Sequence, residues 1–376
     1  MILKTKLFGH VYEFKSVCEV MAKANEEKSG DKLAGIAAET AEERVAAKVV
    51  LSHLTLNDLR NSPAVPYEED EVTRIIQDAV NETIFNEFKN MTVAEFREWL
   101  LDERTTTEMI RHASRGLTSE IVAGVCKLMS NLDLIYAAKK MRVSAHCNTT
   151  IGLPGTFSSR LQPNHTTDDP KGIIASVMEG LSLGCGDAVI GLNPVDDSLE
   201  SVARILKMFD EFKRKWEIPT QICVLAHVTT QTAAADKLGA PLDLMFQSIA
   251  GSQKGNEAFG LTAEMLDEGR ATMLSRGTCT GPNVMYFETG QGSELSSEAH
   301  NGWDQVTMEA RCYGFAKRYQ PFLVNTVVGF IGPEYLYDSK QVTRAGLEDH
   351  FMGKLTGIPM GLSLIHISEP TRLRCI

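Results

Sequence analysis

The chain has 376 residues, of which 43% are hydrophobic, so it can bury a large core and has the length of roughly two domains. Charged residues make up 23% of the chain and no long polar tract occurs, which argues against an intrinsically disordered protein. The net charge of −11 provides no basic footprint, and this argues against broad nucleic-acid binding.

Residues 1–148 are predicted to form a mainly helical domain. Segments 41–59 and 81–101 are rich in Ala, Val, Leu and charged residues. Thr118 is the predicted N-cap of a further helical stretch with apolar residues at helical spacing. Lys139 and Lys140 are predicted to end that stretch. No pattern here suggests chemistry, so we interpret this domain as a scaffold or interface.

From about residue 149, strand-like runs alternate with helix-like runs. The strand-like runs are 154–161, 187–192, 221–226, 242–246, 283–288 and 322–331, with a last candidate at 355–359. The helix-like runs between them include 170–184, 197–212, 233–238, 263–275 and 308–318. Repeated strand–helix units predict a parallel sheet. Roughly seven units without a dinucleotide-binding fingerprint favour an α/β fold of the β/α-barrel type over an open sheet.

Glu288 follows a run of four large apolar residues and precedes a loop that contains Gly290 and Gly292. The run is short and bounded by Pro282, so it reads as a buried strand that ends in a carboxylate. Burying a carboxylate without a partner is costly. Glu288 is therefore either a ligand contact or an ordinary strand-end glutamate paired with a Lys or Arg.

The strand ends of a β/α barrel converge on one mouth, and here they are polar. They carry Arg160, Gln162, Asn193, His227, Gln247 and Glu288. An apolar barrel interior would leave such groups unpaired unless they serve a ligand or one another. This favours a polar small-molecule pocket, with a structural hydrogen-bonded network as the alternative.

The predicted mouth lacks the groups of several familiar catalytic sites. We find no Ser/His/Asp arrangement, no H-E-x-x-H motif and no strand-end lysine for a Schiff base. His227 suits hydrogen bonding as well as it suits catalysis. Such a pocket would bind and orient its substrate while an imported cofactor carries the difficult step.

Cysteine usage and hydropathy indicate a soluble cytoplasmic protein. The eight cysteines are scattered without a C-x-x-C pair or Cys/His cluster, so we predict neither a metal site nor a disulfide framework. The N-terminus has no apolar signal segment. The longest uncharged run, 218–234, contains Gln, Thr and His and would make a poor membrane span.

Long strings of residues carry a resemblance to a known family. They are 148–152, 154–158, 160–164, 186–191, 287–293 and 325–335. From about residue 7 to 361 the chain resembles the large (α) subunit of ethanolamine ammonia-lyase, an adenosylcobalamin-dependent family. The resemblance implies a helical N-terminal domain, 1–148, followed by a (β/α)8 TIM-type barrel at 149–361.

The resemblance also implies the reaction and the partners. Ethanolamine would become acetaldehyde and ammonia by a radical mechanism, started when the cobalt–carbon bond breaks and a 5′-deoxyadenosyl radical takes hydrogen from the carbinol carbon. A small subunit would complete the cofactor site, and large subunits would form a homo-oligomer. The implied location is the cytoplasm, where a bacterial microcompartment can enclose the enzyme.

Individual residues match the family's functional positions. Arg160, Gln162, Asn193 and Glu288 match its substrate-binding and catalytic positions, and Pro194, Gln247 and Ser296 match positions that touch the corrinoid. Glu288 can pair with the substrate ammonium in a charge-assisted contact. Arg160 and Asn193 can hold the hydroxyl, and Gln162 can bridge.

After Gly361 the resemblance ends. The family continues with a Cys-Asp segment, whose aspartate helps to bind the substrate, and an eighth strand. Residues 362–376 instead look like the translation of a transposase-type sequencing adaptor, although a natural divergent tail is the alternative. We therefore expect a truncated barrel of about seven strands with two unpaired edges, unstable or inactive on its own.

Two other functions remain open at this point. The first is a cobalamin-independent barrel lyase or aldolase that acts on a small amino alcohol, which cofactor-free turnover would favour. The second is an inactive truncated fragment that serves only as a binding scaffold. Retained partner binding without affinity for a corrinoid would favour it.

Overall fold

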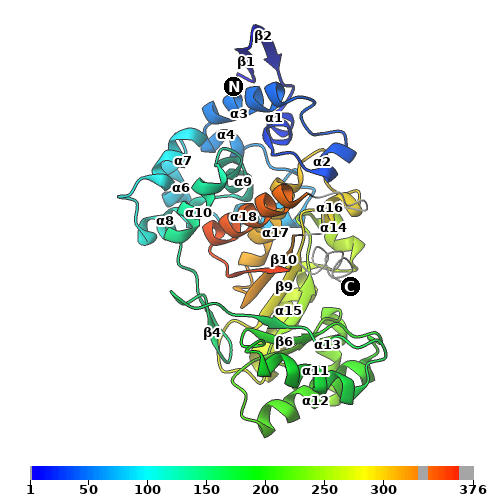
Figure 1. The fold of residues 1–376 in the computed structure, drawn as a ribbon. Coiled ribbons are helices and arrows are strands. Elements are labelled where there is room, and N and C mark those ends of the chain that lie inside the picture. The colour runs from blue at the N-terminus through cyan, green and yellow to red at the C-terminus, as the bar shows by residue number, and fades with distance from the viewer. Residues whose placement is uncertain (1, 329–337, 364–376) are drawn as a thin grey trace.

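The computed structural model describes residues 2–328 and 338–363 of the chain (Figure 1). It opens with an antiparallel hairpin of β1 (Lys4–Leu7) and β2 (His10–Glu13), which the sequence patterns did not predict. A run of short helices follows: α1 (Val17–Ala24), α2 (Ser29–Leu33), α3 (Ala41–His53), α4 (Leu56–Arg60), α5 (Glu71–Asp78), α6 (Glu82–Phe88), α7 (Val93–Leu101), α8 (Thr107–Ala113), the 3-10 turn η1 (Ser114–Gly116), α9 (Ser119–Lys127) and α10 (Asn131–Lys140).

Capping residues inside the helical stretches divide them into separate helices. Thr55 and Thr92 each form a capping box, so segments 41–59 and 81–101 both hold two helices. The stretch that begins at Thr118 also breaks, because Ser130 forms a capping box and starts α10. Thr118 lies at the N-cap position of α9, as predicted. Its side chain, however, makes no capping hydrogen bond.

The strands that follow are short, and most of them are parallel. A small antiparallel pair, β3 (Ala145–His146) and β4 (Thr150–Ile151), comes first. The parallel strands are β5 (Arg160–Leu161), β6 (Val189–Leu192), β7 (Ile222–Val224), β8 (Met245–Ser248), β9 (Met285–Thr289), β10 (Leu323–Val327) and β11 (Met360–Ser363). They form two sheets in chain order, β5-β6-β7 and β8-β9-β10-β11. The Leu244 N–H donates a 3.3 Å hydrogen bond to the Ile222 carbonyl and joins the two sheets.

The predicted α/β class with parallel strands is confirmed, but a closed barrel is not seen. Within the described ranges, β5 and β11 are the outer strands and do not pair with each other. The strand predicted at 355–359 is wrong, because Gly357 adopts a left-handed φ of 92° that ends a helix, and β11 begins only at Met360. The strand predicted at 154–161 shrinks to β5. Strand β10 ends at Val327, and part of the run predicted to 331 lies outside the described residues.

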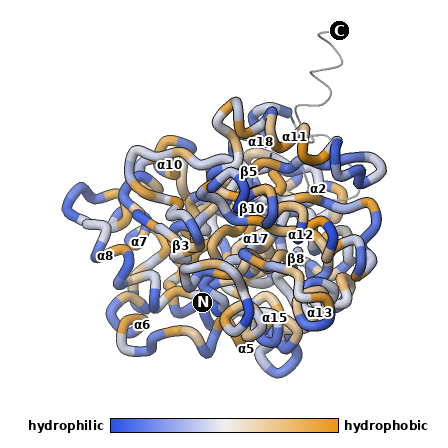
Figure 2. Tube along the Cα trace, turned by 90° about the horizontal axis from the view of Figure 1, so that it is seen from below, coloured by the Kyte–Doolittle hydropathy of each residue, from blue (hydrophilic) through white to orange (hydrophobic). Residues whose placement is uncertain are grey.

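Helices connect the strands and cover the sheets. They are α11 (Pro170–Ser182), α12 (Leu199–Lys215), α13 (Val228–Leu238), α14 (Gln253–Ala258), α15 (Ala263–Arg276), α16 (Ser293–Ser296), α17 (Gln305–Lys317) and α18 (Ser339–Thr356). Figure 1 shows the N-terminal helices, blue to cyan, at one end of the molecule and α11 and α12, in green, at the other. Figure 2, seen from below, places α17 in the middle. No helix within the described ranges has the length and apolar character needed to cross a membrane.

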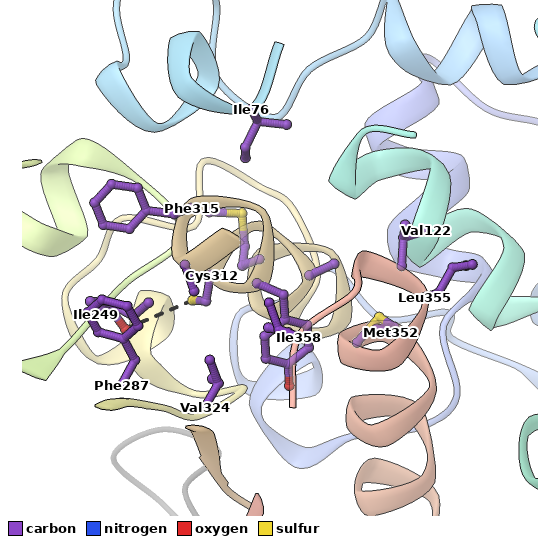
Figure 3. Packing of buried hydrophobic residues seen from close by; sticks show 14 of the residues in the cluster. Ile76, Val122, Ile249, Phe287, Cys312, Phe315, Val324, Met352, Leu355 and Ile358 are labelled. Atoms are coloured by element: carbon purple, nitrogen blue, oxygen red, sulfur yellow. Dashed lines mark hydrogen bonds between the residues drawn. The ribbon is translucent and has the colours of Figure 1, made fainter. Parts of the chain in front are cut away.

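Alternating strand residues divide the interior into two cores. One set of side chains packs on the inner face of the strands, away from the covering helices: Ala145, Cys147, Ile151, Ala188, Val189, Cys223, Leu244, Phe246, Tyr286, Phe322 and Leu323. The other set packs between the strands and the helices. Figure 3 shows part of this second core, where Phe287 and Val324 of the sheet approach Cys312 of α17.

Buried ion pairs fasten α17 and α18 to the N-terminal helices. The Arg311 guanidinium contacts Asp70 at 2.9 Å and Glu120 at 2.7 Å. Lys127 contacts Asp304 at 2.8 Å, and Lys28 contacts Glu348 of α18 at 2.7 Å. Removing one partner of such a pair leaves the other charge buried and uncompensated. The helical region is therefore tied to the strand region by charge as well as by apolar packing.

Candidate functional site

The candidate site lies on the inner face of the strands, near their carboxyl ends. Arg160 comes from β5 in one sheet, and Glu288 comes from β9 in the other. The Arg160 Nη1 atom lies 2.7 Å from Glu288 Oε1, and the two side chains are only 16% and 18% exposed. Strand alternation explains this placement, because Arg160 is paired with the inward-facing Val189 and Glu288 is two residues after the inward-facing Tyr286.

One oxygen of Glu288 receives all of its hydrogen bonds. Besides Arg160, the Asn325 Nδ2 atom donates to Oε1 at 2.8 Å and the Tyr286 hydroxyl donates at 3.2 Å. The Oε2 atom has no hydrogen bond within the described part of the chain. The carboxylate is therefore held at one oxygen and available at the other.

The charges of this cluster change the acidity of its members. Burial raises the pKa of Tyr286 well above its ordinary value, and the negative charge of Glu288 adds to the effect. Burial opposes the charge on Arg160, but Tyr286 and Glu288 outweigh that effect and raise the pKa of Arg160 above its usual range. Arg160 is thus a permanent cation, and the Tyr286 phenol keeps its proton.

Gln162 joins the cluster, whereas Asn193 stands apart from it. The Gln162 Oε1 atom accepts a 2.7 Å hydrogen bond from Arg160 Nη2. Asn193 follows β6 and is exposed; its backbone N–H donates to Asn164 at 2.9 Å, and its side-chain amide has no hydrogen bond within the residues described. The structure therefore brings together Arg160, Gln162 and Glu288, and leaves the Asn193 amide free for a ligand.

His227 and Gln247, which were predicted to join the mouth, bond instead to the start of helix α13. His227 is the N-cap of α13, and its Nδ1 lies 2.8 Å from the Thr229 hydroxyl. Gln247 follows the inward-facing Phe246, so its side chain points to the helix layer, where its Oε1 accepts the Val228 N–H at 2.8 Å. The hydrogen-bonding interpretation of His227 thus has direct support in this geometry. Its buried Nε2 atom, however, has no partner in the described ranges.

The residues predicted to contact the corrinoid occupy different environments. Pro194 is half-buried and directly follows the exposed Asn193. Gln247 is buried, and both polar atoms of its side-chain amide bond to the backbone. Its Oε1 accepts from the Val228 N–H, and its Nε2 donates to the Ser248 carbonyl at 3.1 Å. Ser296 ends α16, and its side chain lies outside the described part of the chain.

Sequence reasoning missed two members of the cluster, Tyr286 and Asn325. Tyr286 lies two residues before Glu288, so the period of a strand places both on one face. Asn325 is the direct neighbour of Glu288 in the β9–β10 ladder. The strand period could have found Tyr286, but Asn325 requires the register between two strands, which the sequence does not contain.

Comparison with known proteins shows the family of the chain. Residues 12–368 match the family model described as ethanolamine ammonia lyase large subunit. The chain belongs to this family. It is 60% identical over 361 residues to the ethanolamine ammonia-lyase large subunit of Escherichia coli strain K12, which covers 96% of this chain and 80% of that protein. The ethanolamine ammonia-lyase large subunit of Salmonella typhimurium strain LT2 is similar to the same extent.

The family match confirms the resemblance that the long strings indicated. Several of the strings, 160–164, 186–191 and 287–293, coincide with β5, β6 and β9 or with the loops beside them. Strings that carried the resemblance to ethanolamine ammonia-lyase large subunits therefore lie in and beside the strands that hold Arg160 and Glu288. The roles of the individual residues remain predictions.

Proposed function

We propose that this chain is the catalytic large subunit of an adenosylcobalamin-dependent ethanolamine ammonia-lyase, which converts ethanolamine to acetaldehyde and ammonia. The observation that carries the proposal is the Glu288 carboxylate, held at Oε1 by three donors and free at Oε2. A half-buried carboxylate prepared in this way suits a small cation. The substrate of the related enzymes, ethanolamine, has an ammonium group of that kind.

Glu288 is proposed to bind the ammonium group through Oε2. The hydrogen bonds from Arg160 and Asn325 fix the carboxylate before the substrate arrives, so little orientation is lost on binding. Arg160 also balances the Glu288 charge in the empty site. When the C–N bond breaks, the carboxylate keeps the departing nitrogen protonated and close.

The substrate hydroxyl is proposed to lie between the guanidinium of Arg160 and the amide of Asn193. Gln162 holds the second nitrogen of Arg160 and so sets the plane of the guanidinium. The Asn193 amide is free to turn toward the hydroxyl. Opposite ends of ethanolamine would thus be recognised by opposite charges, which orients the carbinol carbon.

The residues at the mouth are compatible with a corrinoid. The exposed Asn193 amide offers polar atoms and the half-buried Pro194 ring offers an apolar surface. Gln247 fits less well, because its amide is already bonded to the backbone. Adenosylcobalamin, when bound, supplies the radical chemistry of the reaction. The chain's own residues would bind ethanolamine, orient it and exclude water from the closed site.

The wider assembly is part of the same proposal. The parallel strands β5 to β11 would form seven strands of a (β/α)8 TIM-type barrel with the helical region as a separate domain. A small subunit would complete the cofactor site, further large subunits would form a homo-oligomer, and the enzyme would work in the cytoplasm, enclosed by a bacterial microcompartment where the host makes one. The description of the matching family as a large subunit supports a small-subunit partner, and the match does not favour an aldolase or a binding scaffold.

The test is an acetaldehyde assay of the chain combined with a small subunit and adenosylcobalamin. Glu288→Gln should lower turnover by orders of magnitude while cobalamin binding, followed by its absorption spectrum, is unchanged. The control is Glu268→Gln, on the exposed face of α15. Near-normal turnover of Glu288→Gln would remove the proposed role, and turnover of ethanolamine without the cofactor would favour the cobalamin-independent lyase.

A further inference from the structure

Behind the candidate site lies a second pair of acidic side chains that the proposed reaction does not use. Glu309 of α17 and Asp349 of α18 are both fully buried. Each is bonded to a strand hydroxyl: Thr289 donates to Glu309, and Thr326 donates to Asp349 at 3.0 Å. Both threonines belong to the strands that carry Glu288 and Asn325.

Strand geometry places these contacts directly behind the site. In the β9–β10 ladder, Glu288 is paired with Asn325, and the next pair along is Thr289 with Thr326. Successive residues of a strand point to opposite faces. The first pair therefore faces the substrate pocket, and the second pair faces α17 and α18. Thr289 directly follows Glu288, and Thr326 directly follows Asn325. A contact that holds one of these threonines therefore also restrains the residue before it.

The two carboxyl groups are held by further donors of their own. The Tyr313 hydroxyl donates to Glu309 at 2.8 Å, and the Gln291 amide donates to Asp349 at 2.8 Å. Gln291 is in the loop after β9, so Asp349 also anchors the segment that follows Glu288. Together the contacts form one network that spans two helices, two strands and a loop.

No cation balances this pair within the described residues. The nearby cations are already engaged, since Arg311 contacts Asp70 and Glu120, while Arg344 and Lys28 contact Glu348. Burial, and then the neighbouring Glu309 charge, raises the pKa of Asp349 well above its ordinary value, and burial also raises the pKa of Glu309. Tyr313, Cys312 and Glu348, the other titratable groups near the pair, are neutral or acidic and supply no positive charge. With no cation beside them in the described ranges, burial and mutual repulsion oppose a negative charge on both carboxyl groups at once.

We propose that Glu309 and Asp349 are positioning residues, which hold the ends of β9 and β10 from the helix side so that Glu288 and Asn325 keep their places in the substrate pocket. This inference rests on the proposed ammonia-lyase function for its kinetic readout. Reacting groups that shift by about 1 Å can lose ~100-fold in rate, so support from behind the sheet has a direct effect on catalysis.

The test removes single hydroxyl groups from the two sides of the network. Thr289→Val and Thr326→Val delete the strand contacts and keep the side-chain shape. Tyr313→Phe, the matched control, deletes a hydroxyl that bonds to Glu309 from the helix side and leaves the strand contact in place. The full chain with its small subunit is used for kcat and KM, and hydrogen exchange at residues 286–291 and 324–328 is followed by mass spectrometry.

We expect both valine variants to lower kcat/KM for ethanolamine about 10- to 100-fold and to speed exchange at the two strand ends. Tyr313→Phe should change kcat/KM less than threefold at a similar melting temperature. Glu309→Gln, which still accepts from Thr289, should keep most of the activity that Glu309→Leu loses. Normal kcat/KM in the valine variants, or an equal loss in Tyr313→Phe, would overturn the inference. Hydrogen exchange does not depend on the substrate, so it tests the positioning role even if the wild-type chain makes no acetaldehyde.

Discussion

Asn325 lies directly opposite Glu288 in the β9–β10 ladder and donates a 2.8 Å hydrogen bond to its Oε1 atom. Arg160 reaches the same oxygen at 2.7 Å from the other sheet. Two strands from different parts of the chain therefore orient one carboxylate and leave its Oε2 atom open. An arrangement of this kind is preorganised, because the binding group is fixed by neighbours that the substrate does not displace.

Asn325→Ala should weaken substrate binding while the fold is retained. A hydrogen bond to a charged group contributes about 1.5–3 kcal/mol, so we expect kcat/KM for ethanolamine to fall about 10- to 100-fold, mainly through KM. Steady-state kinetics with the small subunit and adenosylcobalamin checks this. Asn86→Ala, on the exposed side of α6, is the control. Unchanged kinetics in Asn325→Ala would show that Glu288 needs no support from β10.

Tyr286→Phe should separate packing from hydrogen bonding at the site. The phenylalanine ring keeps the edge-on contact with Phe246, whose centroid lies 5.3 Å away, so the melting temperature should change little. The lost hydroxyl bonds to both Arg160 and Glu288, and we expect about a tenfold fall in kcat/KM from the loss of roughly 1.5 kcal/mol. Tyr136→Phe, on the surface of α10, is the matched control. Equal kinetics for the two variants would contradict the prediction.

Glu294 should make the fold less stable as the pH rises toward neutrality. Burial raises its pKa from 4.5 to about 7, and Ser252 donates to it at 2.8 Å. Between these values the folded chain holds a proton that the unfolded chain has released, so unfolding becomes easier with increasing pH, by about 3 kcal/mol across the window.

Glu294→Gln keeps an oxygen for Ser252 and removes the ionisation. The variant should match wild type in urea unfolding near pH 4.5 and become more stable than wild type by about 2–3 kcal/mol at pH 8. Glu268→Gln, with an exposed side chain, should show no such trend. A stability difference that is constant with pH would refute the assignment of the raised pKa.

Arg311→Met should be among the most damaging single changes in the helix layer. It leaves Asp70 and Glu120 buried without their cation, which costs about 3–5 kcal/mol. Arg318→Met, just after the same helix, removes a half-exposed pair with Asp267 and should cost less than about 1 kcal/mol. Thermal unfolding of both variants measures the two losses of stability. Similar losses would mean that the buried contacts of Arg311 add nothing.

The fold class and part of the site were predictable because they depend on local patterns. The apolar run before Glu288 predicts a buried strand, and strand β9 is confirmed there. The alternation of strands and helices predicts a parallel sheet. Glu288 was interpreted either as a ligand contact or as a strand-end glutamate paired with a cation. The two interpretations are compatible, since Glu288 pairs with Arg160 through Oε1 and keeps Oε2 free.

Other features depend on partners far away in the chain and left no local signal. Helix α18 escaped prediction because its buried face carries Arg344, Glu348 and Asp349, each of which has a partner on another element. Gln247 was expected at the mouth, but the register of β8 turns it toward α13. A shift of one residue changes the face that a strand residue points to, and sequence boundaries are rarely that accurate.

The contact between Arg311 and Glu120 also has a consequence for synthesis of the chain. The two residues are 191 positions apart, and the N-terminal helices leave the ribosome first. At ~5–20 residues per second, about 10–40 s pass before Arg311 follows Glu120. During that time Asp70 and Glu120 have no cation with which they can be buried. The ion pairs of Asp70 and Glu120 with Arg311 can therefore form only after much of the second half of the protein has been translated.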